Sequence, residues 1–452
     1  MKWKRYPSYI DSGVELLGSI PSHWRAHKLK HLADVRLSNI DKLSVDDQTV
    51  VRLANYVDVY KNERITADMD LMIATASDDQ IERLSLAVQD VLITKDSESP
   101  DDIAVPAYVS EAMEGVVCGY HLALLRPDTD TLQGGFLYRW LQGKVSQAYF
   151  TSHANGMTRY GIGKGDIGDA PLLWAPLEEQ KTIADFLDRE TTKIDTLIAE
   201  QRNLIERLRE KRAGLVSKFI TKGLDENAAT KPSNDFWLGD VPAHWTVCPL
   251  RYRYTVELGK MLDQRRVTGQ QLAPYLRNTD VQWDSINVLD LPEMDFDGED
   301  RVRYQLQKGD LIVCEGGEVG RAAIWNGELE ECYYQKALHR IRPRDTSKDD
   351  PRFLFYALMD AASRGRFTAG AEKATIAHLP ADTLRRYLFT FPNIQEQQAI
   401  VAHLENELGL LASLLAEAGT SIALLQEHRS ALITAVVTGN VDVRGLVTGA
   451  SA

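Results

Sequence analysis

Apolar residues recur every seven positions in two long segments of the chain. The first series is Leu187, Ile194, Gln201, Leu208 and Leu215, and the same positions 217 residues later are Leu404, Leu411, Ala418, Leu425 and Leu432. A seven-residue apolar repeat is typical of helices that pack along a seam. Proline precedes each segment, at Pro176 and Pro392, and glycine follows it, at Gly223 and Gly439, as expected at helix starts and ends. The pattern predicts two long helices whose leucine and isoleucine positions pack together.

Further apolar positions widen each series into a stripe. They are Ile183, Leu197, Ile198, Leu204 and Ile205 in the first segment and Ile400, Leu414, Leu415 and Ile422 in the second. Each helix of about 40 residues would be about 60 Å long at a rise of ~1.5 Å per residue. Because a single helix with an exposed apolar stripe is not stable in water, we expect the two to form an antiparallel coiled-coil pair. The alternative is an ordinary helical core.

The segments before and between these helices predict strands and short helices in the same order twice. The strand-like runs are residues 51–59, 89–95 and 120–127 in the first half and 274–281, 308–314 and 337–343 in the second, and the helical runs are 136–149 and 352–363. The predicted fold is therefore mixed α/β, with two similar α/β domains, two long helices and an internal pseudo-two-fold repeat. The predicted boundaries are 1–170 and 223–388 for the α/β domains, and 171–222 and 389–452 for the helical segments.

Two phrases mark the repeat most clearly. Residues 18–24 read GSIPSHW and residues 239–245 read GDVPAHW, an offset of 221, and the helix start at Glu179 (EQKTI) returns at Glu396 (EQQAI), an offset of 217. His23 and His244 each lie between a proline turn and a tryptophan, which favours packing or a backbone hydrogen bond over catalysis. Offsets this similar indicate that one sequence unit occurs twice in the chain. We expect the repeated phrases to form a shared frame, with recognition where the copies differ.

Taken together and in this order, several phrases resemble the specificity subunit of type I restriction-modification systems. They are DSGVE at 11–15 with the phrase at 17–24, the two Glu-Gln-x-x-Ile helix starts, Gly309–Ile312 with residues 316–325, and the Thr-Gly that ends at Gly439. The resemblance implies that each α/β section is a target recognition domain that reads one half of a split site in double-stranded DNA. It also implies that the helices set the spacing and dock two methyltransferase subunits.

The resemblance further implies a non-catalytic chain that binds no cofactor itself. S-adenosylmethionine belongs on the methyltransferase partner, and ATP and Mg on restriction or translocase subunits of the full complex. The composition, 44% hydrophobic and 26% charged, is that of a globular protein of about two to four domains. No run of 18 apolar residues and no signal-peptide pattern is present, so we expect a cytoplasmic protein without a membrane partner.

The charge balance argues against a free-standing DNA binder. The net charge is −13 and the sequence pI about 5.3, whereas such proteins usually have a basic domain. DNA contact would then need cations gathered on one face, in two glycine-containing loops at 155–164 and 314–321 and nearby positions. The candidate DNA-binding residues are Lys95, Met157, Thr158, Arg159, Tyr160, Lys164, Arg265, Arg266, Arg277, Gly317, Glu318, Arg321, Lys373 and Thr375. Solvated surface and structural turns are the alternative interpretations.

Enzymatic motifs are missing from the sequence. The chain has no Asn/Asp-Pro-Pro-aromatic motif of amino-methyltransferases, no P-loop, and no Ser-His-Asp or HExxH set. The acidic stretch at 290–300 lacks EF-hand spacing, so no metal site is predicted. Two alternatives to a DNA-reading subunit stay open: a structural adaptor whose duplicated domains bind proteins, and an enzyme with a nonstandard site in the glycine-rich loops.

Overall fold

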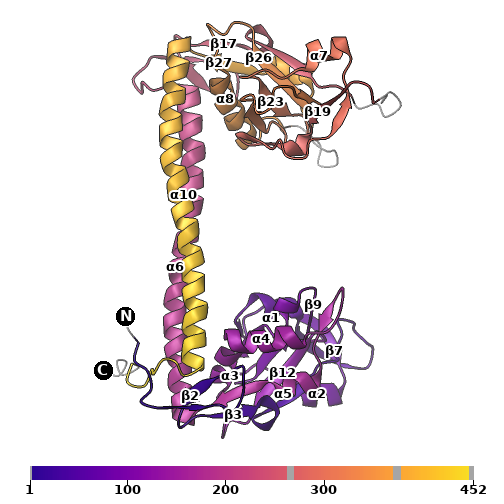
Figure 1. Ribbon diagram of the computed structural model, residues 1–452, viewed down its shortest axis with the longest axis vertical. Helices are drawn as coiled ribbons and strands as arrows, with labels where there is room; N and C mark the ends of the chain where they lie inside the picture. The colour runs from indigo at the N-terminus through magenta and orange to yellow at the C-terminus, as the bar shows by residue number, and fades with distance from the viewer. Residues whose placement is uncertain (1–2, 262–268, 370–377, 447–452) are drawn as a thin grey trace. The chain divides into compact units, whose positions relative to one another are not determined.

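The computed structural model describes residues 3–261, 269–369 and 378–446 of the 452-residue chain. The chain divides into two compact units, one made of Met1–Arg202 with Thr420–Ala452 and one of Asn203–Gly419. Helix α6 (Leu177–Lys222, 46 residues) and helix α10 (Ile394–Val437, 44 residues) each contribute one part to each unit (Figure 1). Both units mix strands and helices, which confirms the mixed α/β class.

The elements of the first unit precede α6 in the chain. Its strands are β1 (Tyr9–Asp11), β2 (Ser19–Pro21), β3 (Arg25–Lys28), β4 (Ala33–Leu37), β5 (Thr49–Ala54), β6 (Arg64–Ile65), β7 (Met72–Ala76), β8 (Val91–Thr94), β9 (Asp96–Ser97), β10 (Pro106–Val109), β11 (Val116–Cys118), β12 (Leu122–Pro127), β13 (Tyr160–Gly161) and β14 (Pro171–Trp174). Its helices are η1 (Leu29–His31), α1 (Tyr56–Lys61), α2 (Asp78–Leu84), η2 (Pro100–Asp102), α3 (Gly134–Leu141), α4 (Lys144–His153) and α5 (Lys164–Asp169). The segment predicted as helical from 171 therefore begins with β14.

A five-stranded sheet in the order β4-β12-β8-β10-β6 forms the centre of the first unit. Strand β12 pairs antiparallel with both β4 and β8, and Leu122, Ala123, Leu124 and Leu125 are fully buried. Because successive side chains of a strand point to opposite faces, this run fills two cores. Ala123 and Leu125 pack in the core that contains α3 and α6, and Leu122 and Leu124 pack in a second core on the other face.

The second unit also consists of strands and short helices around a central sheet. Its strands are β15 (Thr230–Pro232), β16 (Asp240–Pro242), β17 (Thr246–Pro249), β18 (Tyr254–Leu258), β19 (Leu272–Leu276), β20 (Val281–Gln282), β21 (Ser285–Ile286), β22 (Glu293–Asp295), β23 (Leu311–Cys314), β24 (Ala322–Ile324), β25 (Tyr333–Tyr334), β26 (Leu338–Pro343) and β27 (Leu388–Phe391). Its helices are η3 (Leu250–Tyr252), η5 (Asn278–Asp280), α7 (Gly298–Tyr304), α8 (Pro351–Ser363) and α9 (Ala381–Arg386).

The central sheet of the second unit has the order β18-β26-β23-β24, so its first three strands occupy the places of β4, β12 and β8. Strand β23 also divides its side chains between two cores. Leu311 and Val313 lie in the core with α8 and the long helices, and Ile312 and Cys314 lie in the other.

Two predictions of local structure are wrong. The helix predicted over 136–149 is interrupted, because Gly143 has an extended backbone (φ −71, ψ 143) and caps α4. The strand-like run predicted over 51–59 ends at Ala54. Asn55 follows with φ −93 and ψ 173 and caps α1 in a capping box with Asp58, so the polar break starts a helix.

The predicted seam positions of the long helices lie mostly inside. Leu187, Ile194, Leu208, Leu404, Leu411 and Leu432 are buried, and Leu215 and Leu425 are half-buried against the two cores. The first part of α6 packs with the last part of α10 in the first unit, and the last part of α6 packs with the first part of α10 in the second. Leu197, Leu204 and Leu414, which were expected to widen the stripe, are instead between 43% and 47% exposed.

Helix α10 presents much apolar surface. Among helices in the described part of the chain, it is the one whose length and composition would let it cross a membrane: an 18-residue window has a mean hydropathy of 1.8, and 11% of that window is buried. Length and composition alone do not assign a membrane span. The exposed leucines include Leu410, Leu414 and Leu424. Exposed apolar stripes of this kind are typical of interaction surfaces.

In the first unit, the repeated phrase binds the start of α6 and the end of α10. Glu179 is buried in the first turns of α6, and its carboxylate accepts hydrogen bonds from Tyr6 Oη (2.6 Å) and Trp24 Nε1 (3.2 Å) and contacts His23 Nε2 (2.8 Å). Gly439, just past α10, has a φ of 73° and lies so close to Pro21 that a Cβ would overlap the proline ring. One tryptophan-containing turn thus joins two helix ends.

The second unit repeats this contact. Glu396, near the start of α10, accepts a hydrogen bond from Trp245 Nε1 (2.9 Å) and contacts His244 Nε2 (2.9 Å). Gly223, just past α6, has a φ of 74°, and a Cβ there would lie 3.0 Å from the Trp245 ring. The histidines therefore contact a helix carboxylate rather than a backbone group.

Candidate nucleic-acid interface

In the first unit, a half-buried cation and an exposed aromatic ring meet at the ends of two central strands. Lys95 directly follows β8, and Tyr120 stands two residues before the antiparallel neighbour β12. Lys95 Nζ lies 4.5 Å from the centre of the Tyr120 ring and donates a hydrogen bond to the carbonyl of Ser38 (3.2 Å). Tyr120 is 48% exposed, so its ring is available to a ligand in solution.

The neighbouring residues hold an arginine beside this pair. Asp96 Oδ2 lies 2.7 Å from His121 Nδ1, and Arg159 Nη2 lies 3.0 Å from His121 Nδ1 and 3.3 Å from its Nε2. In the tautomer in which Nδ1 donates to the Asp96 carboxylate, Nε2 is free to accept from Arg159. Arg159 is exposed, so the remaining guanidinium donors stay available.

Arg159 stands at the tip of a short hairpin. Asn155 and Gly161 exchange both backbone hydrogen bonds (2.9 Å each), and Tyr160–Gly161 forms β13 against β9. Gly156 has a φ of 147°, and a Cβ there would overlap the Arg159 carbonyl, so the turn requires glycine. Met157, which is 94% exposed, Thr158 and Arg159 project from this tip.

Two stacked tyrosines of α1 lie on the other side of β9. The rings of Tyr56 and Tyr60 are 5.5 Å apart and nearly parallel, and Tyr56 Oη donates to Ser97 Oγ of β9 (3.3 Å). The negative charge of Asp102 raises the pKa of Tyr60, which therefore stays a neutral, stackable ring. We call Tyr56, Tyr60, Lys95, Tyr120, His121 and Arg159 the Lys95 surface. Aromatic rings beside cations suit a nucleic acid, because rings stack on bases and cations bind phosphate or base edges.

Lys164 lies elsewhere in the first unit. It begins α5 and lines an open groove of about 650 Å³ together with Lys30, His31 and Arg126. Arg126 is paired with Asp90 and Lys30 with Asp169, which leaves Lys164 as the less engaged cation of the groove. The structure therefore brings Lys95, Met157, Thr158, Arg159 and Tyr160 together, but not Lys164.

In the second unit, Arg277 is held by a neighbour. It caps η5, and its Nε and Nη2 donate to the two carboxylate oxygens of Asp280 (2.9 and 2.8 Å). The hydrogen bond to Asp280 raises the pKa of Arg277. Its side chain is 41% exposed, but the guanidinium is already engaged on one edge.

The glycine loop after β23 is stabilised internally. Arg321 is 15% exposed, and its Nη2 donates to the carbonyl of Asn278 (3.0 Å). Glu318 is exposed and accepts from Trp283 Nε1 (2.5 Å), next to the exposed Gly317 with a φ of 73°. Burial raises the pKa of the Cys314 thiol at the loop's start. These contacts give Arg321 a structural role in the loop and leave Gly317 and Glu318 on its surface.

Arg265, Arg266, Lys373 and Thr375 lie outside the described residues. Sequence reasoning missed Tyr56, Tyr60, Tyr120 and His121, which the structure places on the Lys95 surface. The available signal was the Tyr-His pair immediately before an apolar strand. Among the described residues, no group of three His, Cys, Asp or Glu side chains is arranged to hold a metal ion.

Comparison with known families and proteins gives consistent matches. The family model for the type I restriction modification DNA specificity domain matches residues 21–207 and 294–411. The type I restriction enzyme MjaVIII specificity subunit of Methanocaldococcus jannaschii is 22% identical over 317 residues, 69% of this chain and 71% of the relative. The MjaX specificity subunit of the same organism is 24% identical over 255 residues, and the matched part spans 56% of each protein, about half of that relative's length.

Solved structures show the same fold. A chain from a structure concerned with complex assembly and conformational transition of the type I R-M system has a TM-score of 0.68 at 14% identity and covers 92% of this chain and 98% of its own. The HsdS subunit from Thermoanaerobacter tengcongensis has a TM-score of 0.51 at 14% identity and covers 93% of this chain and 98% of its own.

Proposed function

Because the chain belongs to the type I restriction-modification DNA specificity family, whose named relatives are non-catalytic specificity subunits, we propose that it reads DNA sequence for partner enzymes. Each α/β domain, within 1–170 and 223–388, is a target recognition domain that reads one half of a bipartite site in double-stranded DNA. The partners are two methyltransferase subunits, which carry S-adenosylmethionine, and restriction subunits, which carry ATP and Mg.

One observation supports this function. The central strands follow a similar order in the two units, but the residues at the ends of those strands differ. In the first unit Lys95 follows β8, and Tyr120 and His121 precede β12. At the same places in the second unit, Glu315 follows β23, and Lys336 and Ala337 precede β26. Strands β8 and β23 are both fully buried, whereas the residues at these strand ends differ in charge and ring content. Two unlike surfaces on one frame suit two unlike half-sites.

The long helices support a ruler and a docking surface. We infer that α6 and α10 form an antiparallel coiled coil, because the start of one and the end of the other share a core in each unit. The exposed leucines of α10 suit an apolar surface of a partner protein. A net charge of −13 repels phosphate, so we expect partner subunits to supply part of the contacts to the DNA phosphates.

A domain exchange tests this function. Residues 15–170 are replaced with the first recognition domain of another family member, and the complex with its methyltransferase partner is used in a DNA protection assay. We expect one half-site to change and the other to stay, because the second domain is untouched. Retention of both half-sites would overturn the assignment of reading to these domains. Absence of any sequence-selective protection by the parent complex would favour the protein-binding adaptor.

Arg159→Ala is expected to weaken binding of the methyltransferase complex to its site about 10- to 100-fold, which corresponds to about 1–3 kcal/mol for one base-reading contact. The loss should fall on DNA with the first half-site intact and be small on DNA with that half-site scrambled. Fluorescence anisotropy at fixed salt measures both.

The matched control is Arg83→Ala, which removes the same charge from an exposed pair with Asp79 on α2. It should change affinity less than twofold. Equal losses for both variants would mean that only bulk charge matters and that the Lys95 surface reads no base.

A further inference from the structure

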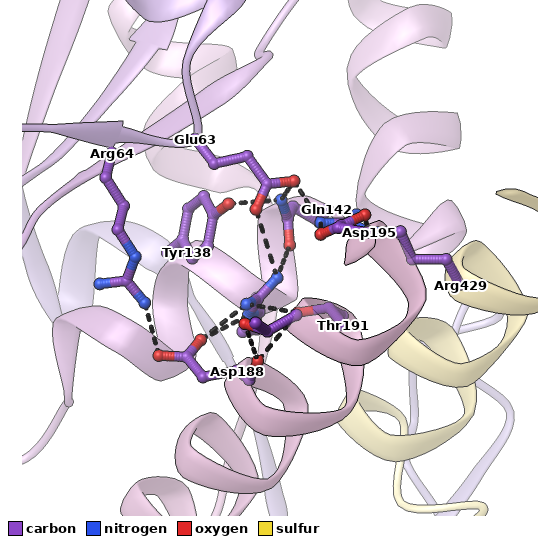
Figure 2. A network of polar contacts seen from close by, with 10 residues as sticks. Glu63, Arg64, Tyr138, Gln142, Asp188, Thr191, Asp195 and Arg429 are labelled. Carbon is purple, nitrogen blue, oxygen red and sulfur yellow. Dashed lines mark hydrogen bonds and ion pairs between the residues drawn. The ribbon is translucent and has the colours of Figure 1, made fainter. Parts of the chain in front are cut away.

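A polar network joins the first α/β domain to both long helices (Figure 2). Glu63, between α1 and β6, binds Arg429 of α10 through a short ion pair. Arg429 also binds Asp195 of α6, with its Nε 2.9 Å from Asp195 Oδ1. Arg429 is 17% exposed, whereas the Glu63 and Asp195 carboxylates that it binds are 46% and 47% exposed.

A second arginine extends the network from α3 to α6. Arg139 is 3% exposed, and its Nη2 donates to Asp188 Oδ1 (2.6 Å) and to Thr191 Oγ1 (2.9 Å). Its Nη1 lies 3.8 Å from Glu63 Oε2, and Arg64 Nη2 donates to the other oxygen of Asp188 (2.5 Å). The network therefore contains two bridges between the domain and α6, at Asp188 and at Asp195.

The charges of this network balance. Three arginines (Arg64, Arg139 and Arg429) meet three acids (Glu63, Asp188 and Asp195). Apolar packing of α3 on α6 already attaches the domain, and such packing has no directional preference. Ion pairs of arginine with several hydrogen bonds do have directional geometry, whereas the net contribution of half-exposed pairs to stability is small. The network is thus better suited to fixing the angle between the first α/β domain and the long helices than to attaching that domain.

The second unit has a simpler contact at the corresponding place. Arg352 of α8 donates from Nε to Glu405 of α10 (3.0 Å) and from Nη2 to Asp284 of the β20–β21 turn (2.8 Å). Glu405 stands 217 positions after Asp188, the same offset as the helix starts. A buried or half-buried arginine again links a domain carboxylate to a long-helix carboxylate.

We propose that these arginines are positioning residues that fix the angle of each recognition domain on the long helices, and that this angle sets which spacing between half-sites is accepted. The inference rests on the proposed function for its effect on DNA. The angle itself can be measured without DNA.

The first experiment measures the angle as a distance distribution in the full-length protein. Spin labels are placed at Asp79→Cys on α2 and Glu200→Cys on α6, both in the first unit, with the half-buried Cys248 replaced by serine. The other three cysteines are buried. Glu63→Gln and Arg429→Met are expected to widen the distribution at least twofold. Arg139 is almost fully buried, so its substitution could unfold the domain. The test therefore uses the milder variants Glu63→Gln and Arg429→Met.

Lys193→Met is the control, since it removes an exposed pair with Glu190 on the same helix. Its distribution should match that of the parent. Unchanged distributions in Glu63→Gln and Arg429→Met, with the native melting transition kept, would overturn the proposal.

The second experiment measures spacing with the methyltransferase complex and sites whose spacer differs by one base pair in either direction. The parent should prefer one spacer, and both variants should lose at least tenfold of that preference while keeping both half-site sequences. A parent that selects no site would refute the proposed function, and the labels would still report on the angle. A parent that selects one spacer and variants that keep it, even with widened distances, would refute the role of the network in spacing.

Discussion

Replacing Glu179 with methionine is expected to lower the free energy of unfolding of the first unit by about 3–5 kcal/mol, because two buried donors lose their acceptor at about 1–3 kcal/mol each. The substitution leaves the Tyr6 hydroxyl and the Trp24 indole N–H without their acceptor in a closed core. Burial, and then the hydrogen bond to Glu179, raises the pKa of Tyr6, so the hydroxyl stays a donor at neutral pH. Urea unfolding followed by segment-resolved hydrogen exchange measures the loss in this unit separately.

Glu396→Met is the matched control in the second unit. Glu396 accepts from Trp245 and contacts His244, has no tyrosine partner in those contacts, and is 24% exposed. Water can therefore replace part of what the carboxylate provides, and we expect a loss of about 1–2 kcal/mol. Equal losses in the two units would contradict the account in which the buried tyrosine and full shielding make Glu179 the stronger anchor.

The difference between these two glutamates shows what the sequence could predict. The matching phrases and offsets predict that the two halves share a frame, since packing of Trp24 and of Trp245 depends on the same local turn. The acceptor of each tryptophan was not predictable, because Glu179 is 155 residues away from Trp24 in the chain. Hydrogen bonds over such separations depend on which helix end reaches the turn, and no local pattern encodes that.

The DNA-reading candidates show a second limit. Lys95 was selected as a cation, and the structure places it beside an exposed ring. Arg321 was selected as part of the glycine-containing loop at 314–321, but its guanidinium donates to the carbonyl of Asn278. Loop composition gives the chemistry available but not the direction of a side chain. Tyr120 was missed for the opposite reason, since it extends an apolar run and only strand pairing shows that β12 begins two residues later, at Leu122.

The long helices were the most predictable elements, and the exposed leucines were the least. A seven-residue repeat, a proline before it and a glycine after it define a helix by local rules. The side that faces a neighbour depends on the packing of each unit. Leu197 and Leu204 continue the apolar series but face out. The sequence therefore has more apolar positions in these helices than the contacts of each unit bury.

Inserting one heptad into both long helices, after Gln201 and after Ala418, is expected to lengthen the preferred DNA spacer by about three base pairs. Seven residues add about 10 Å at ~1.5 Å per residue, and base pairs are ~3.4 Å apart. The insertions fall next to the boundaries between the two compact units, at 202/203 and 419/420, so each unit keeps its own core. Selection of protected sites from a library with randomised spacers measures the change.

A five-residue insertion at the same positions is the control. Five residues rotate the following helix by about 140° relative to the seam, whereas seven rotate it by only about 20°. The buried residues that follow each insertion, such as Leu208 in α6 and Leu432 in α10, would then be out of register with the buried residues before it, and we expect site-specific binding to be lost. An unchanged spacer after the seven-residue insertion would refute the ruler. Equal tolerance of both insertions would mean that the helices link the domains without a packed seam. The domain angles fixed by Arg139 and Arg352 could not then determine the spacing between half-sites.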